Sequence, residues 1–279
     1  MTALLRVEDL TVEVRSAHGT STPVNGISFD IERGETVGIV GESGSGKSLT
    51  AMSIIQLLPT RAVRMVGGRI LFDGDDMAGF GASRMRDIRG RRIGTIFQEP
   101  MTALNPAFTI GFQIAEPLRR HLKLSRTQAK ARVIELLDMV GIHRSAQTAA
   151  SYPHQLSGGM RQRAMIAMAM SCEPDLLIAD EPTTALDVTT QSQILDLVLD
   201  LQESHGTAVL LVTHDLGVVA ETCRRVVVMR RGEIVEKSDV DALFRAPEHP
   251  YTRGLLESMP SRNAGKDRLP TVAERAGLS

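Results

Sequence analysis

The sequence predicts an α/β fold built on a parallel sheet, and two observations support this prediction. Several short runs are rich in Val, Ile and Leu, as the buried strands of a parallel sheet are. Longer segments with helical periodicity separate these runs, and this alternation of strand and helix is typical of a parallel α/β sheet. The predicted strands cover residues 36–41, 92–98, 175–180 and 208–214, and the predicted helices cover residues 48–58, 126–140, 160–170 and 191–204.

An antiparallel β-subdomain is predicted before this core. Residues 8–16 and 25–32 alternate apolar and polar side chains, and Ile27, Phe29 and Ile31 share one face of the second segment. Such alternation indicates strands that are buried on one side only, as in antiparallel sheets. We therefore expect the N-terminal strands to form a small sheet of their own.

Strand signals vanish between residues 99 and 170, where helical periodicity predicts an inserted helical subdomain. Farther along, residues 224–236 predict a hairpin that turns at Arg231 and Gly232. Four regions follow from these patterns. Residues 1–98 should hold the β-subdomain and the first part of the core, 99–171 the helical subdomain, 172–245 the second part of the core, and 246–279 a C-terminal segment and tail.

Composition excludes several classes of protein. The 279 residues include 32 basic and 33 acidic side chains, for a net charge of −1, so no global positive field favours nucleic acid. The two cysteines, Cys172 and Cys223, form no CxxC pair, which disfavours a disulfide framework or a zinc site. We expect both to be buried thiols. No apolar stretch approaches the roughly 20 residues that span a bilayer, so we expect any membrane association to run through partners.

The segment GESGSGKS at Gly41–Ser48 fits G-x-x-x-x-G-K-[ST] between a predicted strand and a predicted helix, which is the context that this phosphate-binding motif requires. Its glycines let backbone N–H groups point at phosphate oxygens, and the helix N-terminus adds partial positive charge. Lys47 should reach the β and γ phosphates, and Ser48 should bind Mg²⁺. The alternative is a glycine-rich turn that merely precedes a helix, and the motif alone indicates only nucleoside triphosphate binding. The candidate nucleotide-binding residues here are Gly41, Glu42, Ser43, Gly44, Ser45, Gly46, Lys47, Ser48 and Leu49.

Polar side chains end the other three predicted strands: Gln98, the pair Asp180 and Glu181, and His214. Because ligands of parallel sheets bind at the carboxyl edge of the strands, we expect these side chains to lie beside the phosphates. Asp180 closes an apolar run and should hold Mg²⁺. Glu181 is placed to deprotonate an attacking water as a general base.

Gln98 and His214 carry weaker signals. The Gln98 amide can touch both Mg²⁺ and water, and His214 can donate a hydrogen bond to the γ-phosphate or to the water. Taken singly, each is a common surface residue, and an Asp-Glu pair is more often a helix N-cap followed by a first-turn acid. The apolar strand before Asp180 favours the catalytic interpretation. The candidate catalytic residues are therefore Glu181, His214 and Gln98, and the candidate metal ligands are Ser48, Gln98 and Asp180.

A second anion site is predicted in the segment LSGGMRQR at Leu156–Arg163. Ser157 occupies an N-cap position, and two glycines, Gly158 and Gly159, precede a helix-forming run. An ordinary capped helix is the alternative. Because one chain then carries two phosphate-binding devices, the second is expected to serve a nucleotide held by another subunit.

In the order of these motifs the chain resembles ABC-type ATPases over about residues 5–260. GESGSGKS resembles the Walker A motif, Gln98 the Q-loop, LSGGMRQ the signature, LLIADE the Walker B motif, TALD at Thr184–Asp187 the D-loop and His214 the switch histidine. The resemblance implies a P-loop NTPase (RecA-like) core that hydrolyses ATP with Mg²⁺, and it adds Asp187 to the nucleotide-binding residues. It also implies a head-to-tail pair of homologous or identical ATPase subunits, in which Ser157, Gly158 and Gly159 of one chain face the γ-phosphate at Lys47 of the other.

More narrowly, FQEPMTALNP from Phe97, SYPHQLSGGMRQR from Ser151, DEPTTALDVTTQ from Asp180 and HPYTRGLLESMP from His249 resemble the peptide/nickel importer ATPases. This implies uptake of di- or oligopeptides, or of a related small solute such as nickel. The implied partners are integral-membrane permease subunits, which dock on the helical subdomain, and indirectly an extracytoplasmic solute-binding protein. The implied location is peripheral, on the cytoplasmic side of the cell membrane.

Two features depart from the family pattern. Phe29 is the only aromatic residue before Gly41, so Val14, Arg15 or His18 is expected to cover the adenine base instead. No cysteine follows Cys223, so no iron–sulfur cluster is expected.

Two alternative functions remain. The first is a soluble ABC ATPase of DNA repair or translation, which a second cassette, a coiled-coil insertion or a basic face would favour. The second is a kinase, which leaves LSGGMRQ unexplained.

Overall fold

The computed structural model describes residues 3–17, 19–184 and 186–259. Its contacts divide the chain into two compact units, Met1–Ala78 with Leu210–Ser279 as unit 1 and Gly79–Val209 as unit 2. The four-region division at residues 98, 171 and 245 stays a prediction. In the part of the chain that the structure describes, no helix is long and apolar enough to cross a membrane.

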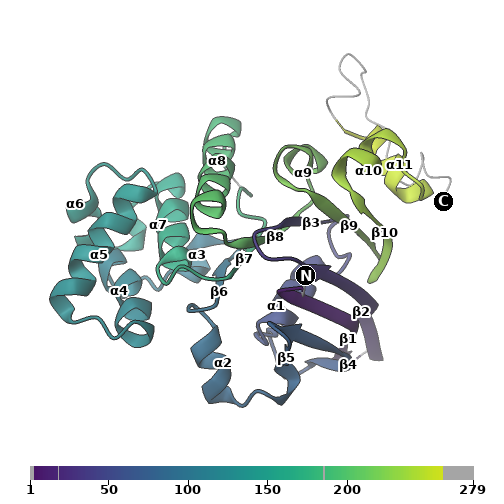
Figure 1. Ribbon diagram of the computed structural model, residues 1–279, viewed down its shortest axis with the longest axis horizontal. Coiled ribbons are helices and arrows are strands. Elements are labelled where there is room, and N and C mark those ends of the chain that lie inside the picture. Colours follow the sequence, from purple (N-terminus) through teal and green to yellow (C-terminus); the bar gives the residue numbers. More distant parts are fainter. Residues whose placement is uncertain (1–2, 18, 185, 260–279) are drawn as a thin grey trace. The chain divides into compact units, whose positions relative to one another are not determined.

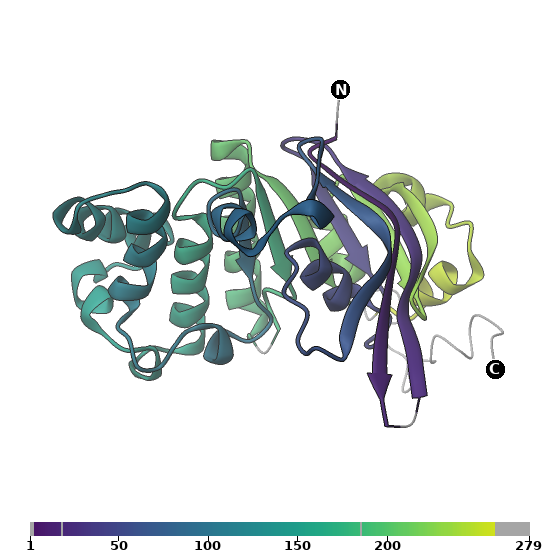
Figure 2. The same ribbon diagram turned by 90° about the horizontal axis from the view of Figure 1, so that it is seen from below.

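Unit 1 contains the predicted antiparallel sheet. Its strand order is β2-β1-β4-β5, and β1 pairs antiparallel with both β2 and β4. In Figure 2, β1 and β2 form a long hairpin. The predicted apolar face is confirmed, because Ile27, Phe29 and Ile31 are all buried. The strands are β1 (Leu5–Ser16), β2 (Gly19–Ile31), β4 (Val63–Phe72) and β5 (Asp75–Asp76).

The second group of strands in unit 1 has the order β10-β9-β3-β8, with β3 parallel to β9, and β8 begins two residues before the unit boundary at Leu210. β9 and β10 form the predicted antiparallel hairpin, and Arg231 (φ 49°) and Gly232 (φ 86°) make its turn. Two successive positive φ values are typical of a tight hairpin turn, and glycine adopts them without strain. The strands are β3 (Thr36–Val40), β8 (Ala208–Thr213), β9 (Arg225–Arg230) and β10 (Glu233–Asp239).

The helices of unit 1 pack around these strands. A buried cluster joins Val40 at the end of β3 to residues of β9 and of the three C-terminal helices, among them Val219, Leu243 and Tyr251. This cluster fixes the segment after β10 against the core strands. The helices are α1 (Lys47–Ile54), α9 (Leu216–Thr222), α10 (Val240–Arg245) and α11 (Pro250–Glu257), and a 3₁₀ turn, η1 (Met77–Gly79), crosses the boundary between the units.

Unit 2 holds the predicted helical region together with two parallel strands, β6 (Ile93–Ile96) and β7 (Leu176–Asp180). The helical prediction for residues 99–170 is confirmed, and α4, α5, α6 and α7 lie side by side (Figure 1). Ser125 caps α5 reciprocally with Gln128, which satisfies N–H groups at the helix start. The helices are α2 (Ala82–Ile88), α3 (Pro100–Ala103), α4 (Ile110–His121), α5 (Arg126–Met139), α6 (Ser145–Ala150), η2 (Pro153–Gln155), α7 (Gly158–Met170) and α8 (Val188–His205).

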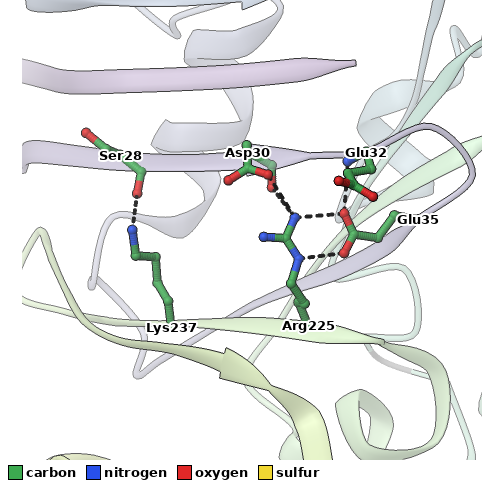
Figure 3. A network of polar contacts seen from close by, with 6 residues as sticks. All are labelled: Ser28, Asp30, Glu32, Glu35, Arg225 and Lys237. Carbon is green, nitrogen blue, oxygen red and sulfur yellow. Dashed lines mark hydrogen bonds and ion pairs between the residues drawn. The ribbon is translucent and has the colours of Figure 1, made fainter. Parts of the chain in front are cut away.

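One charged network ties β9 to the antiparallel sheet within unit 1 (Figure 3). The Arg225 guanidinium donates to both oxygens of the Glu35 carboxylate and to Asp30 at 3.1 Å. Burial raises the pKa of Glu35, but the bonds from Arg225 and from the Glu32 N–H outweigh it, so the pKa lies below its usual 4.5. The Glu35 side chain is only 5% exposed, so its negative charge is stabilised by the ion pair with Arg225 more than by water.

Replacing Arg225 with Ala should therefore lower the free energy of unfolding at pH 7 by about 2 kcal/mol, because it strands a buried carboxylate while Arg225 itself is partly hydrated. Urea denaturation measures this loss. The pKa of Glu35 is lower in the folded state than in the unfolded state, so the stabilisation is present above pH 4.5 and disappears as pH falls through the folded pKa. The difference between parent and variant should shrink accordingly below pH 4.5.

Arg33→Ala is the matched control. The Arg33–Asp73 pair is exposed on both sides, at 53% and 42%, and such pairs contribute about 0–1 kcal/mol. If both variants lose equal stability at pH 7, the buried Glu35 carboxylate is not the cause.

Candidate functional site

The glycine loop lies where the sequence predicts it, between β3 and α1 in unit 1. Gly46 caps α1 in a left-handed conformation with φ 104°, and a Cβ there would lie 2.3 Å from the carbonyl oxygen of Pro23. Gly41 is equally tight, with a Cβ position 2.2 Å from the Met229 carbonyl oxygen. Both positions require glycine for steric reasons, so the loop path is fixed by its neighbours in unit 1.

The Lys47 amine is bound inside the loop. Its Nζ donates to the carbonyl oxygens of Gly41 at 2.8 Å and of Glu42 at 3.0 Å, and the side chain is only 5% exposed. These bonds fold the lysine back along the loop, which brings a buried positive charge to the start of α1. A positive charge and a helix N-terminus at one place favour an anion.

A phosphate fits this loop on the evidence of its own atoms. Among the residues that the structure describes, the buried Ser45 Oγ has no hydrogen-bond partner, and α1 receives no side-chain cap at Gly46. Gly44 has φ 79° with open space around its Cβ position, so the loop remains accessible on that side. Phosphate oxygens would satisfy such a hydroxyl, and the partial positive charge of a helix N-terminus favours an anion. Ser48 and Leu49 belong to the first turn of α1.

The carboxyl ends of the two parallel strands in unit 2 bring Gln98 and Glu181 together. Gln98 follows β6, and its Nε2 donates to Glu181 Oε2 at 2.9 Å. Thr184 Oγ1 donates to the same oxygen, also at 2.9 Å. Two neutral donors thus orient one carboxylate oxygen. The sequence predicted the meeting of Gln98 and Glu181 but not the contribution of Thr184.

Asp180 and Glu181 differ in environment although they are neighbours. Asp180 is the last residue of β7 and is 4% exposed, whereas Glu181 is half-buried and has the unusual φ of 45°. A non-glycine residue in this left-handed region is uncommon and is held there by surrounding contacts. Here the Thr184 N–H donates to the Glu181 carbonyl at 3.2 Å, which closes a turn. The reversal directs the Glu181 side chain toward Gln98.

The predicted second anion site begins α7 in unit 2. Ser157 is its N-cap, and its Oγ accepts from the Met160 N–H at 3.3 Å. Ser157 and Gly158 are exposed and Gly159 is half-exposed, so the helix start faces outward. Farther along the helix, the buried Gln162 amide donates to the Pro182 carbonyl, next to Glu181. This bond connects the LSGGMRQ helix to the turn after β7 within unit 2.

Asp187 caps α8 in the same unit. Its carboxylate accepts from the Thr190 N–H at 2.9 Å and from the Thr190 hydroxyl at 2.7 Å. The Thr190 N–H and hydroxyl hold the pKa of Asp187 below its usual value. Ala185, in the middle of the TALD segment, lies outside the described residues.

His214 follows β8 in unit 1 and is exposed. It belongs to the same unit as the glycine loop, whereas Gln98, Asp180, Glu181 and Ser157 belong to unit 2. The meeting of all these side chains at one sheet edge stays a prediction.

Three other predictions from the sequence concern residues outside the core of the site. Val14 and Arg15 lie near the end of β1, half-buried and exposed respectively, and His18 lies outside the described residues. Cys172 is buried as expected, and Cys223 is partly buried, with burial raising its pKa to about 11. Pro260 and the predicted tail after it lie outside the described residues.

Comparison with known families places two models on the chain. Residues 24–184 match the family described as ABC transporter. Residues 235–277 match the family described as oligopeptide/dipeptide transporter, C-terminal region. The two matches cover different parts of the sequence, and the first spans more than half of it.

Individual relatives and solved structures show the same likeness. The probable peptide ABC transporter ATP-binding protein y4tR of Sinorhizobium fredii is 51% identical over 96% of this chain and 81% of its own length. The oligopeptide transport ATP-binding protein OppD of Bacillus subtilis is 48% identical over 98% of this chain and 76% of its own length. Among solved structures, a dimeric ATP-binding cassette in a post-hydrolysis state with ADP and Pi matches with a TM-score of 0.76 and 28% identity, over 85% of this chain and 98% of that one.

Proposed function

Because this chain belongs to the ABC transporter ATP-binding proteins and carries the C-terminal region of the oligopeptide/dipeptide transporters, we propose that its ATP hydrolysis energises the import of di- or oligopeptides. The observation that carries the peptide assignment is the match over residues 235–277, which the general ABC transporter family model does not include. The relatives from Sinorhizobium fredii and Bacillus subtilis are named as peptide and oligopeptide transport ATP-binding proteins, which supports this assignment.

We assign the nucleotide phosphates to the glycine loop of unit 1. The buried Lys47 amine, the Ser45 hydroxyl and the uncapped start of α1 provide the positive charge and donors that phosphate oxygens need. Lys47 then exchanges its bonds to the loop carbonyls for bonds to phosphate. Adenine is assigned to the end of β1, where Val14 and Arg15 lie.

We assign catalysis to the carboxyl ends of β7, β6 and β8. Glu181 acts as the general base that takes a proton from the attacking water, and the donors Gln98 and Thr184 fix its orientation. His214 donates a hydrogen bond to the γ-phosphate or to the same water. In this scheme Thr184 acts only through Glu181 and is a positioning residue.

The residues also fit Mg²⁺, whose part is to neutralise phosphate charge when it is bound. Among the described residues no three acidic, histidine or cysteine side chains gather into a metal cluster. Mg²⁺ does not require such a cluster, because it commonly binds through only one or two carboxylates, and phosphates and waters fill much of its octahedral shell. Ser48, Gln98 and Asp180 are the proposed protein ligands.

We further propose a head-to-tail dimer with another ATPase subunit, homologous or identical. A single chain has two helix starts suited to anions, at α1 and at α7. In the dimer, Ser157, Gly158 and Gly159 of one subunit complete the site at Lys47 of the other, and the Asp187 segment lies near the same interface. The dimeric state of the solved cassette with ADP and Pi supports this arrangement.

The proposed partners in the membrane are integral permease subunits, which dock on the helical region of unit 2. An extracytoplasmic solute-binding protein would deliver the peptide to them. The chain then works as a peripheral subunit on the cytoplasmic side of the cell membrane, because that side holds the ATP.

Deletion of the gene for this chain in its source cell tests the transport proposal. Uptake of labelled di- and oligopeptides should fall to background and should return with the parent gene but not with Lys47→Ala. Uptake of a free amino acid serves as the control and should not change. Unchanged peptide uptake, or loss of nickel uptake alone, would contradict the peptide assignment.

A further inference from the structure

The C-terminal segment reaches the glycine loop through one side chain. The hydroxyl of Tyr251, in the first turn of α11, accepts a hydrogen bond of 3.1 Å from the backbone N–H of Glu42. Tyr251 is 1% exposed, so its side chain is shielded from bulk water where it accepts this bond. Sequence position gives no hint of this contact, because the two residues are 209 positions apart.

Tyr251 is held rigidly in place from several directions within unit 1. Its ring packs in the buried cluster with Val40, the residue just before the loop, and the Arg230 guanidinium lies 5.1 Å from the ring centroid. The start of α11 is fixed in turn, because Glu236 of β10 accepts from the N–H groups of Glu248 and His249. The phenol is therefore a fixed acceptor and not a mobile side chain.

The β9–β10 hairpin, whose Glu236 holds the start of α11, contacts the glycine loop at a second point. The Gly232 N–H, in the turn between β9 and β10, donates to the Ser45 carbonyl at 3.1 Å. The loop is thus bound at its first residues by α11 and near its middle by the hairpin that anchors α11. Burial is the main cause that raises the pKa of Tyr251, so the phenol stays neutral.

We propose that Tyr251 is a positioning residue of the ATP site: through Glu42 it holds the beginning of the phosphate loop in its binding conformation, which makes the C-terminal segment a working part of the nucleotide site. This inference rests on the proposed role of Gly41–Ser48 as the phosphate loop. Tyr251 does not itself touch ATP. Its contribution is to remove the cost of ordering the loop when ATP binds.

Tyr251→Phe in the full chain removes the hydroxyl and keeps the ring. We expect the KM for ATP to rise about fivefold, equivalent to about 1 kcal/mol, with kcat within twofold of the parent. The reason for this split is that loop ordering contributes equally to the ground state and the transition state of hydrolysis. Steady-state ATP hydrolysis at varied ATP concentration measures both constants, and thermal unfolding shows that each variant is folded.

Two further variants show whether a rise in KM comes from the lost Tyr251 hydroxyl or from a general loss of stability. Leu243→Ala opens a cavity in the same buried cluster and should lower the unfolding temperature while KM stays within twofold of the parent. Tyr152→Phe removes the hydroxyl of the other tyrosine, in unit 2, and should change neither quantity. A KM for Tyr251→Phe within twofold of the parent overturns the proposal, and so does an equal rise in KM for Leu243→Ala.

Lys47→Ala distinguishes this inference from the function on which it rests. That variant should lose ATP affinity more severely than Tyr251→Phe. If Lys47→Ala keeps the parent affinity, the phosphate-loop assignment fails and the inference falls with it. If Lys47→Ala is impaired while Tyr251→Phe matches the parent, only the role of Tyr251 is refuted.

Discussion

Glu181→Gln should bind ATP like the parent and hydrolyse it at least about a hundredfold more slowly, which corresponds to a barrier increase of about 2.7 kcal/mol. The amide keeps the shape of the carboxylate, and its oxygen can still accept from Gln98 and Thr184 as the Glu181 carboxylate does at 2.9 Å. What the variant loses is the basic oxygen that we propose takes a proton from the attacking water. Because the nucleotide is not consumed, the ATP-bound dimer should accumulate.

Two measurements on the purified chain check this expectation: the rate of ATP hydrolysis, and the fraction of dimer in the presence of ATP by size-exclusion chromatography. Glu173→Gln is the matched control, since Glu173 is an exposed carboxylate of the same unit that pairs with Arg132. It should hydrolyse ATP at the parent rate. A Glu181→Gln protein that turns over at the parent rate would remove Glu181 as the base.

The parts of the site that the sequence could predict are those formed by neighbours along the chain. The glycine loop, the strand that ends in Asp180 and the capped start of α7 each depend on a few consecutive residues, and the structure has all three. The meeting of Gln98 with Glu181 was also predictable, because parallel strands bring their carboxyl ends to one edge.

What the sequence could not predict depends on contacts between distant segments. Tyr251 touches the loop only because β10 and its Glu236 carry α11 back to the core, and no periodicity records such a return. The sequence patterns also do not predict the long strand β4, which depends on pairing with a distant segment. Its centre contains Gly67 and Gly68, which weaken the strand signal, and pairing with β1 outweighs their low propensity.

Thr184 shows an intermediate case. The TALD segment resembles a motif in the sequence, but the Thr184 hydroxyl reaches the Glu181 carboxylate only because of the turn at Glu181, whose φ of 45° is a property of the folded chain. Arg225 is similar, because its partners Glu35 and Asp30 come from the N-terminal part of the sequence. In both cases the sequence shows the residue type but does not show which residue it contacts in the fold.

The proposed sharing of the ATP site between two subunits leads to a second prediction with a large effect. Ser157→Arg places a bulky cation at the exposed start of α7, and Lys47→Ala removes the buried amine of the loop, so each variant alone should lose at least about a hundredfold in hydrolysis rate. A mixture of the two inactive proteins should nevertheless regain activity. In a mixed dimer, Lys47 of the first variant faces Ser157 of the second, and one complete site forms.

The recovered activity has a definite size. With random pairing of equal amounts, half of the dimers are mixed and each has one intact site of two, so the mixture should reach about a quarter of the parent rate if the sites act independently. Titration of one variant into a fixed amount of the other, with ATP hydrolysis as the measurement, should show the rate rising and then saturating. If each site used its own Lys47 and Ser157, no mixing ratio would restore hydrolysis. Recovery above half of the parent rate would mean two active sites in the mixed dimer, which sharing between subunits does not allow.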